Sequence, residues 1–82
     1  MTQDEARTAV QQFGGSLDFN QIMVIVAGLR MCLRVDAFPD RIAGTDWAVA
    51  VHGRDGTAEA MHATPLGAAR LALHRYFTGE VL

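Results

Sequence analysis

A hairpin signal in the second half of the chain constrains its fold more than any other feature. In residues 47–51, Trp-Ala-Val-Ala-Val, a large apolar side chain stands at every second position, and the turn sequence Gly-Arg-Asp-Gly-Thr follows soon after. A period of two is typical of a strand with one buried face. The turn sequence fits a three-residue loop, a type I turn closed by a glycine bulge with Gly56 at positive φ. This loop pairs residue 51 with 59, 49 with 61 and 47 with 63, so Met61 rather than His62 is expected on the buried face.

Helical signals stand on both sides of the hairpin. Apolar residues recur at helical spacing over residues 3–13 and again over residues 65–77, so we expect a helix in each range. The signals that bound them are the Thr2 and Glu5 capping box and a left-handed stop at Gly14-Gly15 for the first, and Thr64, Pro65 and Gly79 for the second.

Residues 21–36, QIMVIVAGLRMCLRVD, are the ambiguous part of the sequence. Residues 22–27 are all apolar, and residues 29–36 alternate strictly between apolar and other side chains. The β-branched content of the first part and the glycine at position 28 favour two strands joined near residues 27–28. A buried helix running on through Leu33 is the alternative.

The expected architecture is a single α+β domain over residues 1–82, in the order α-β-β-β-β-α, with an antiparallel sheet and both helices packed on one face. The other face of the sheet is then uncovered, with small and apolar side chains at its centre and basic ones at its rim. The outward set is Met23, Ile25, Arg30, Cys32, Arg34, Ala48, Ala50, His52, Ala58, Ala60 and His62. This composition is closer to an interface than to a solvated sheet face. In the alternative, the loop over residues 37–46 or the N-terminal arm covers Met23 and Ile25.

The residues that carry chemistry elsewhere do not form a catalytic or metal-binding pattern here. None of the soft metal ligands has the spacing of a zinc site, and the acids around the long loop, Asp36, Asp40 and Asp46, lack the spacing of a calcium loop. The glycines lack a phosphate-binding pattern, and no nucleophile is paired with a base. We therefore expect that the chain is not an enzyme and that it binds no metal ion and no cofactor.

Charge and composition restrict the partners. The net charge is -2 and all seven basic residues are arginine, a residue usage typical of a GC-rich bacterial genome or its phage. An acidic chain is disfavoured as a nucleic-acid binder, because such proteins gain affinity by neutralising phosphates. The N-terminal residues are acidic where a signal peptide is basic, and the longest apolar run is far shorter than a membrane span. We expect a cytoplasmic protein of a bacterial host cell, with no membrane partner.

Residues 46–77, DWAVAVHGRDGTAEAMHATPLGAARLALHRYF, resemble the C-terminal hairpin and helix of small phage-encoded accessory proteins of the NinX type. In those proteins a tryptophan strand leads to a Thr-Pro-Leu or Asn-Pro-Leu cap and an Ala-Ala helix, here Thr64-Pro65-Leu66-x-Ala68-Ala69. The resemblance implies a phage or prophage origin and carries over no catalytic residue. The expected topology also resembles the double-stranded RNA-binding domain, but Pro-Leu-Gly stands where that family has the lysines that grip phosphates.

These expectations lead to one function and two alternatives. The favoured function is a small non-enzymatic phage or mobile-element protein that binds and blocks a host protein complex such as a CRISPR effector, an anti-CRISPR-type inhibitor. The residues expected to bind the partner are Arg30, Arg34, His52, His62, Met23 and Ile25, with Asp36 and Asp40 as mimics of a nucleic-acid backbone. The alternatives are a structural or regulatory homodimer, and a weak RNA- or DNA-binding module that uses Arg70 and Arg75.

Overall fold

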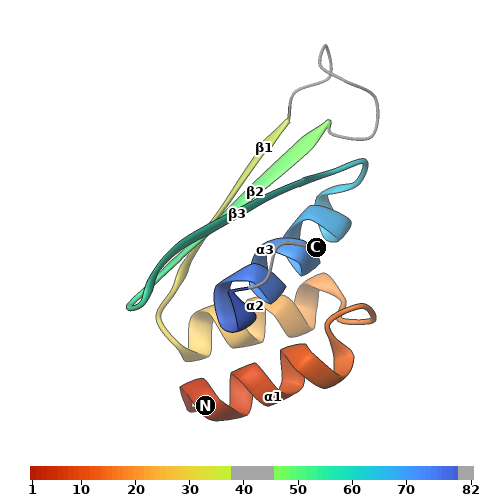
Figure 1. The fold of residues 1–82 in the computed structure, drawn as a ribbon. Helices are drawn as coiled ribbons and strands as arrows, with labels where there is room; N and C mark the ends of the chain where they lie inside the picture. Colours follow the sequence, from red (N-terminus) through yellow and green to blue (C-terminus); the bar gives the residue numbers. More distant parts are fainter. Residues whose placement is uncertain (38–45, 80–82) are drawn as a thin grey trace.

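The computed structural model describes residues 1–37 and 46–79, which form three helices and a three-stranded antiparallel sheet in the order β1-β2-β3 (Figure 1). The elements are α1 (Gln3–Phe13), α2 (Phe19–Gly28), β1 (Cys32–Ala37), β2 (Trp47–Gly53), β3 (Gly56–His62) and α3 (Pro65–Thr78). The α+β class and the antiparallel sheet are confirmed. The prediction of four strands is wrong, because residues 22–27 lie in α2.

Helix α2 forms where the sequence favoured a strand. The side chain of Asp18 accepts a hydrogen bond from the amide of Gln21 at 2.8 Å, and the amide of Asp18 donates to the Gln21 side chain at 2.9 Å, which completes a capping box. The residues Ile22, Ile25 and Val26 are buried, and their spacing of three and four is helical. Capping and burial together outweigh the strand preference of β-branched side chains, which is a weak determinant.

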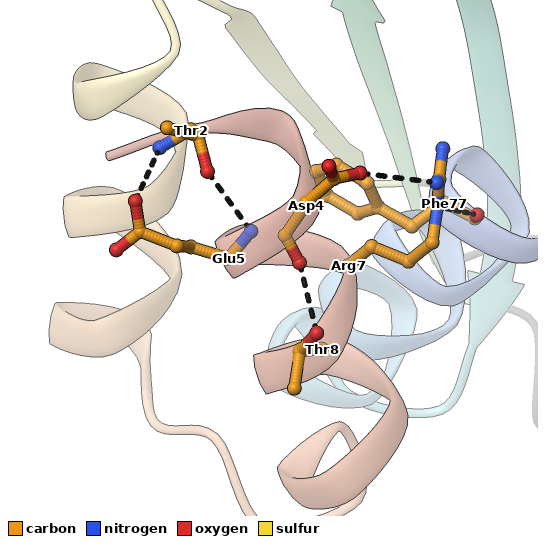
Figure 2. Close-up of polar contacts among 6 residues, drawn as sticks. All are labelled: Thr2, Asp4, Glu5, Arg7, Thr8 and Phe77. Atoms are coloured by element: carbon orange, nitrogen blue, oxygen red, sulfur yellow. Dashed lines mark hydrogen bonds and ion pairs between the residues drawn. The ribbon is translucent and has the colours of Figure 1, made fainter.

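The N-terminal half of α1 is fixed by its cap and by a contact with the end of α3 (Figure 2). The predicted capping box is present: Thr2 Oγ1 accepts from the amide of Glu5, and the Thr2 amide donates to Glu5 Oε1. Arg7 donates from Nε to the carbonyl oxygen of Phe77 at 3.2 Å and lies 3.5 Å from Asp4, which ties α1 to the end of α3.

The two predicted helix stops differ in their backbone conformation. Gly14 has φ -53 and lies in the right-handed region, so the left-handed stop expected there is wrong. Gly79 has φ 73 and ends α3 as expected.

The hairpin is present, but its register differs by one residue from the prediction. Gly53 pairs with Gly56 across a two-residue loop, although Gly56 does have positive φ. Trp47 therefore faces His62, so the imidazole lies on the helix side of the sheet and Met61 on the other side. The reason lies in α3, whose small buried side chains Ala68, Ala69 and Ala72 bring the helix close to β3 and leave room only for Ala58 and Ala60 beneath it.

Helix α3 is the centre of the molecule. All three helices lie on one side of the sheet, and α3 packs on β2 and β3 and contacts α1 and α2 on its other side (Figure 1). Helix α2 lies beside α3 and contacts β1. All three helices share one core, whose largest fully buried side chains are Ile22, Leu73, Val10, Val49 and Val51.

Candidate protein-binding surface

The far face of the sheet, which turns away from the helices, is polar. Its side chains are Cys32, Arg34 and Asp36 on β1, Ala48, Ala50 and His52 on β2, and Thr57, Glu59 and Met61 on β3. Arg34 Nε lies 3.0 Å from Asp36 Oδ2, and His52 Nδ1 lies 2.9 Å from Thr57 Oγ1. Charged and hydroxyl side chains that pair with one another around two alanines are typical of a solvated sheet face. The oily docking face expected from the sequence is therefore not formed.

The residues predicted to bind a partner do not share one surface. Arg34, His52 and Asp36 share the far face of the sheet, as expected. Arg30 stands in the turn before β1 with φ 54, where it lines a shallow hollow with Arg54 and Asp4. Asp40 lies outside the described residues. Met23 and Ile25, expected on one strand face, are on opposite sides of α2, with Met23 45% exposed and Ile25 3% exposed.

His62 lies on the helix side of the sheet, where it supports the start of α3, and not on the far face. Its Nδ1 accepts from the amide of Thr64 at 3.3 Å, and Thr64 in turn caps α3 by accepting from the amide of Gly67 at 3.0 Å. A Cβ atom at Gly67 would overlap the imidazole ring, so glycine at this position lets the ring approach the helix. The shift in hairpin register is what brings His62 to this side.

The two arginines of the nucleic-acid alternative are engaged by the fold. Arg70 donates from Nε to the carbonyl oxygen of Leu17 at 2.7 Å, and Arg75 donates from Nη1 to the carbonyl oxygen of Glu59 at 2.7 Å. One contact holds the loop between α1 and α2, and the other lies at the outer edge of β3. Charged donors to backbone carbonyls make strong hydrogen bonds, so these guanidinium groups are held by the protein itself.

Among the described residues, most of the large apolar side chains that are exposed lie on α2 and at the two ends of α1. Helix α2, FNQIMVIVAG, contains no charged residue, and Met23 and Val24 are about half exposed. Met1, Phe13 and Val24 form the rim of a groove between α1 and α2, and Phe13 is 56% and Val24 57% exposed. The groove has a volume of about 270 Å³, and Leu17 and Ile25 lie at its buried floor. An open apolar groove of this size is large enough for one or two side chains of a protein partner.

Acidic groups lie next to this groove. A second hollow shares Ala9 and Phe13 with the groove and extends along α1 to Asp4 and Glu5. The hydrogen bond with the Thr2 side chain, and after it the bond with the Thr2 amide, lowers the pKa of Glu5 below its ordinary value, which keeps the carboxylate ionised. Two cationic groups lie near these carboxylates: Arg7, 3.5 Å from Asp4, and the amino group of Met1, a residue that lines the groove.

The opposite flank of α2 is also apolar. Phe19, Met23 and Ala27 are four residues apart and form one stripe, on the other side of α2 from Gln21 and Val24, which face the groove.

Three further findings bear on function. Within residues 1–37 and 46–79, no helix has the length and apolar content needed to cross a membrane. No group of three or more histidine, cysteine, aspartate or glutamate side chains in the same ranges is placed to hold a metal ion. Comparison of the chain with protein-family models, with curated proteins and with solved structures finds no match.

Proposed function

We propose that this chain is a small non-enzymatic phage or mobile-element protein that binds and blocks a host protein complex, with an anti-CRISPR-type inhibitor as the most concrete form. The observation that carries the proposal is the apolar groove between α1 and α2. Phe13 and Val24 at its rim are each more than half exposed, next to a buried floor. A small protein that exposes a large aromatic side chain over a preformed groove has the composition of an interface core.

The chemistry around the groove indicates what kind of partner it accepts. The groove takes an apolar side chain, and the carboxylates of Asp4 and Glu5 lie along the same helix. A complementary partner surface is apolar and carries basic side chains next to the apolar contact. Complexes that hold nucleic acid expose basic surfaces of this kind, so an acidic protein seated there competes with the nucleic acid for the same cations. The blocking role thus moves from the far face of the sheet, where the sequence placed it, to the helical side.

The proposal is tested by a plaque assay in bacteria that carry an active CRISPR system directed against a phage. Expression of the wild-type chain is expected to restore plaque formation. Phe13→Asp and Val24→Asp each place a charge in the groove. We expect each substitution to weaken binding to the host complex about 30-fold or more, so that plaques no longer form. Both side chains are largely exposed, so both variants are expected to fold, which far-UV circular dichroism checks.

Met61→Asp is the matched control, because Met61 is an exposed apolar residue on the far face of the sheet. It is expected to retain full activity. Loss of activity in Met61→Asp together with unchanged activity in Phe13→Asp would mean that the binding site lies on the far face of the sheet and not in the groove. Co-sedimentation of the purified chain with the effector complex separates direct binding from an indirect effect on the host.

A further inference from the structure

Strand β1 has a free edge whose hydrogen-bonding groups can be assigned. Neighbouring residues of an antiparallel strand direct their amide and carbonyl groups to opposite sides. Because the carbonyl oxygen of Glu59 points out of β3 to Arg75, Glu59 and its partner Ala50 form a pair without mutual hydrogen bonds. Alternation across β2 then turns the backbone groups of Arg34, the other partner of Ala50, toward β2. The outward groups of β1 are therefore those of residues 33, 35 and 37.

The two edges of the sheet differ in how they are covered. At β3, Arg75 occupies the outward carbonyl of Glu59. At β1, none of the described residues makes a hydrogen bond to the outward groups of residues 33–37, and Val35 is 40% exposed although it lies on the helix side of the sheet. The sequence of β1, CLRVDA, contains neither proline nor lysine, the residues that commonly keep an edge strand from pairing with another chain.

Symmetry restricts how this edge can pair with a second copy of itself. In an antiparallel pair around a two-fold axis, the residue at the centre faces the same residue of the other chain. A centre at Arg34 or at Asp36 sets like charges directly opposite each other, which destabilises a sheet. A centre at Leu33 needs the amide of Met31, which already donates to the carbonyl oxygen of Val26 at 2.8 Å.

A centre at Val35 meets every one of these conditions. It pairs Leu33 with Ala37 of the partner subunit through outward-facing backbone groups. It also sets Arg34 opposite Asp36 of the partner subunit, in the pair without mutual hydrogen bonds, where side chains are closest. On the helix side, Val35 meets Val35 of the partner subunit.

We infer that the chain forms a homodimer through β1, in the register centred on Val35, which joins two three-stranded sheets into one of six strands. Arg34 and Asp36, 3.0 Å apart within one chain, then form a two-by-two group with the same two residues of the other chain, in which each charge has the opposite charge beside it and across from it.

Sedimentation velocity over a range of concentrations tests the dimer through a mass that rises from 8.9 kDa to twice that value. Arg34→Glu sets two acids opposite each other and Asp36→Arg sets two cations opposite each other, so each variant alone is expected to dimerise about tenfold more weakly. An equimolar mixture of the two variants again places acid opposite base at both pairs. We expect the mixture to recover the wild-type dimerisation constant as a heterodimer.

Arg54→Glu and Glu59→Arg are the matched controls, because they make the same charge changes at exposed positions in the hairpin, away from β1, and leave the dimer unchanged. A wild-type chain that stays monomeric up to millimolar concentration overturns the dimer. A dimer whose strength does not respond to the single reversals, or that the mixture does not restore, overturns the register. Far-UV circular dichroism of each variant shows that the subunit itself is folded.

A cross-link provides a second measurement of the register in a Cys32→Ser background. Chains with Arg34→Cys and chains with Asp36→Cys are expected to form a disulfide when mixed, because Cα atoms in such a pair lie about 4.5 Å apart, within disulfide range. Neither variant is expected to cross-link with itself, because that needs a bond across a diagonal of about 7–8 Å. Self-linked chains in place of mixed ones contradict the register.

Discussion

Met23 and Ile25 stand two residues apart in the segment where sequence and structure disagree, and alanine substitutions at these two positions separate a helix from a strand. On a strand the two side chains point to the same face and the two substitutions have similar effects. On a helix they are separated by about 200° and their effects differ. In the structure Ile25 is 3% exposed and contributes to the core, whereas Met23 is 45% exposed.

The burial of each side chain sets the size of the effect. Ile25→Ala removes three buried carbon atoms, which lowers the free energy of unfolding by about 2.4 kcal/mol from the lost transfer into the core. The cavity left behind raises the loss to about 3–4 kcal/mol. Met23→Ala leaves no enclosed cavity, and alanine is the better helix former, so the loss is less than about 1 kcal/mol. A domain of this length has a total stability of about 4–12 kcal/mol, so the larger loss is readily measured.

Urea denaturation followed by far-UV circular dichroism measures both values under identical conditions. We expect the urea midpoint of Ile25→Ala to fall strongly and that of Met23→Ala to stay close to wild type, with the same m-value for both. Equal losses at the two positions, or a larger loss at Met23, would refute the helical assignment. The groove would then disappear with it, because Ile25 and Val24 line the groove only as parts of a helix.

Two further predictions concern a close contact and a titrating cap. Gly53→Ala places a Cβ atom 2.6 Å from Cζ of Tyr76, whose hydroxyl accepts a hydrogen bond from the amide of Asp55. This overlap is expected to lower the free energy of unfolding, measured by urea denaturation, by about 1–3 kcal/mol. The loss is expected to be smaller when the same substitution is made in a Tyr76→Leu background. A full loss in both backgrounds would show that the overlap is not the cause. Because the pKa of Glu5 is lower in the folded chain than its ordinary value of 4.5, its capping contribution is present above pH 4.5 and is lost as the pH falls through the folded value. Carboxyl NMR titration is expected to find a depressed pKa for Glu5 that returns toward 4.5 in Thr2→Ala, and a pKa that is the same in both chains would contradict this assignment.

The parts of the fold that the sequence predicts well are those set by local chemistry. Helix α1 begins at Gln3, directly after its Thr2 cap, and Glu5 completes the capping box, as expected. Helix α3 begins at Pro65, directly after its Thr64 cap, also as expected. The hairpin between β2 and β3 follows from alternation and from Gly56. In each case the signal and the structure that it specifies lie within a few residues of each other, so no knowledge of the tertiary fold is needed.

Helix α2 was expected only as the alternative to two strands, although a local signal for it was present. Asp18 and Gln21 have the spacing of a capping box, the same signal that identified α1. The uninterrupted apolar run that follows hides the helical period, because a segment that is apolar on all sides shows no contrast between a buried and an exposed face. Among its residues Met23 and Val24 are exposed while Ile25 and Val26 are buried, a difference that hydropathy alone does not contain.

The hairpin register depends on a contact that is distant in the sequence. Matching large apolar residues across the strands favoured Met61 on the buried face, but α3 approaches β3 closely enough that alanines fill this layer. Helix α3 can lie this close to β3 because its buried side chains are alanines and because Gly67 leaves space for the ring of His62. A shift of one residue reverses every side chain of a strand, so it replaced Ala58, Ala60 and His62 on the far face with Thr57, Glu59 and Met61. Met23 and Ile25 are absent from that face for a different reason, because they lie in α2.

The position of α3 also explains why the groove and the free sheet edge are formed by different elements. Because α3 packs on β2 and β3, the groove lies between α1 and α2, and β1 keeps a free edge at the end of the sheet. Pairing of two chains through β1 uses none of the residues that line the groove at Val24. A dimer of this kind presents two grooves to a host complex, so Arg34→Glu is expected to reduce the avidity of blocking without changing the affinity of a single groove.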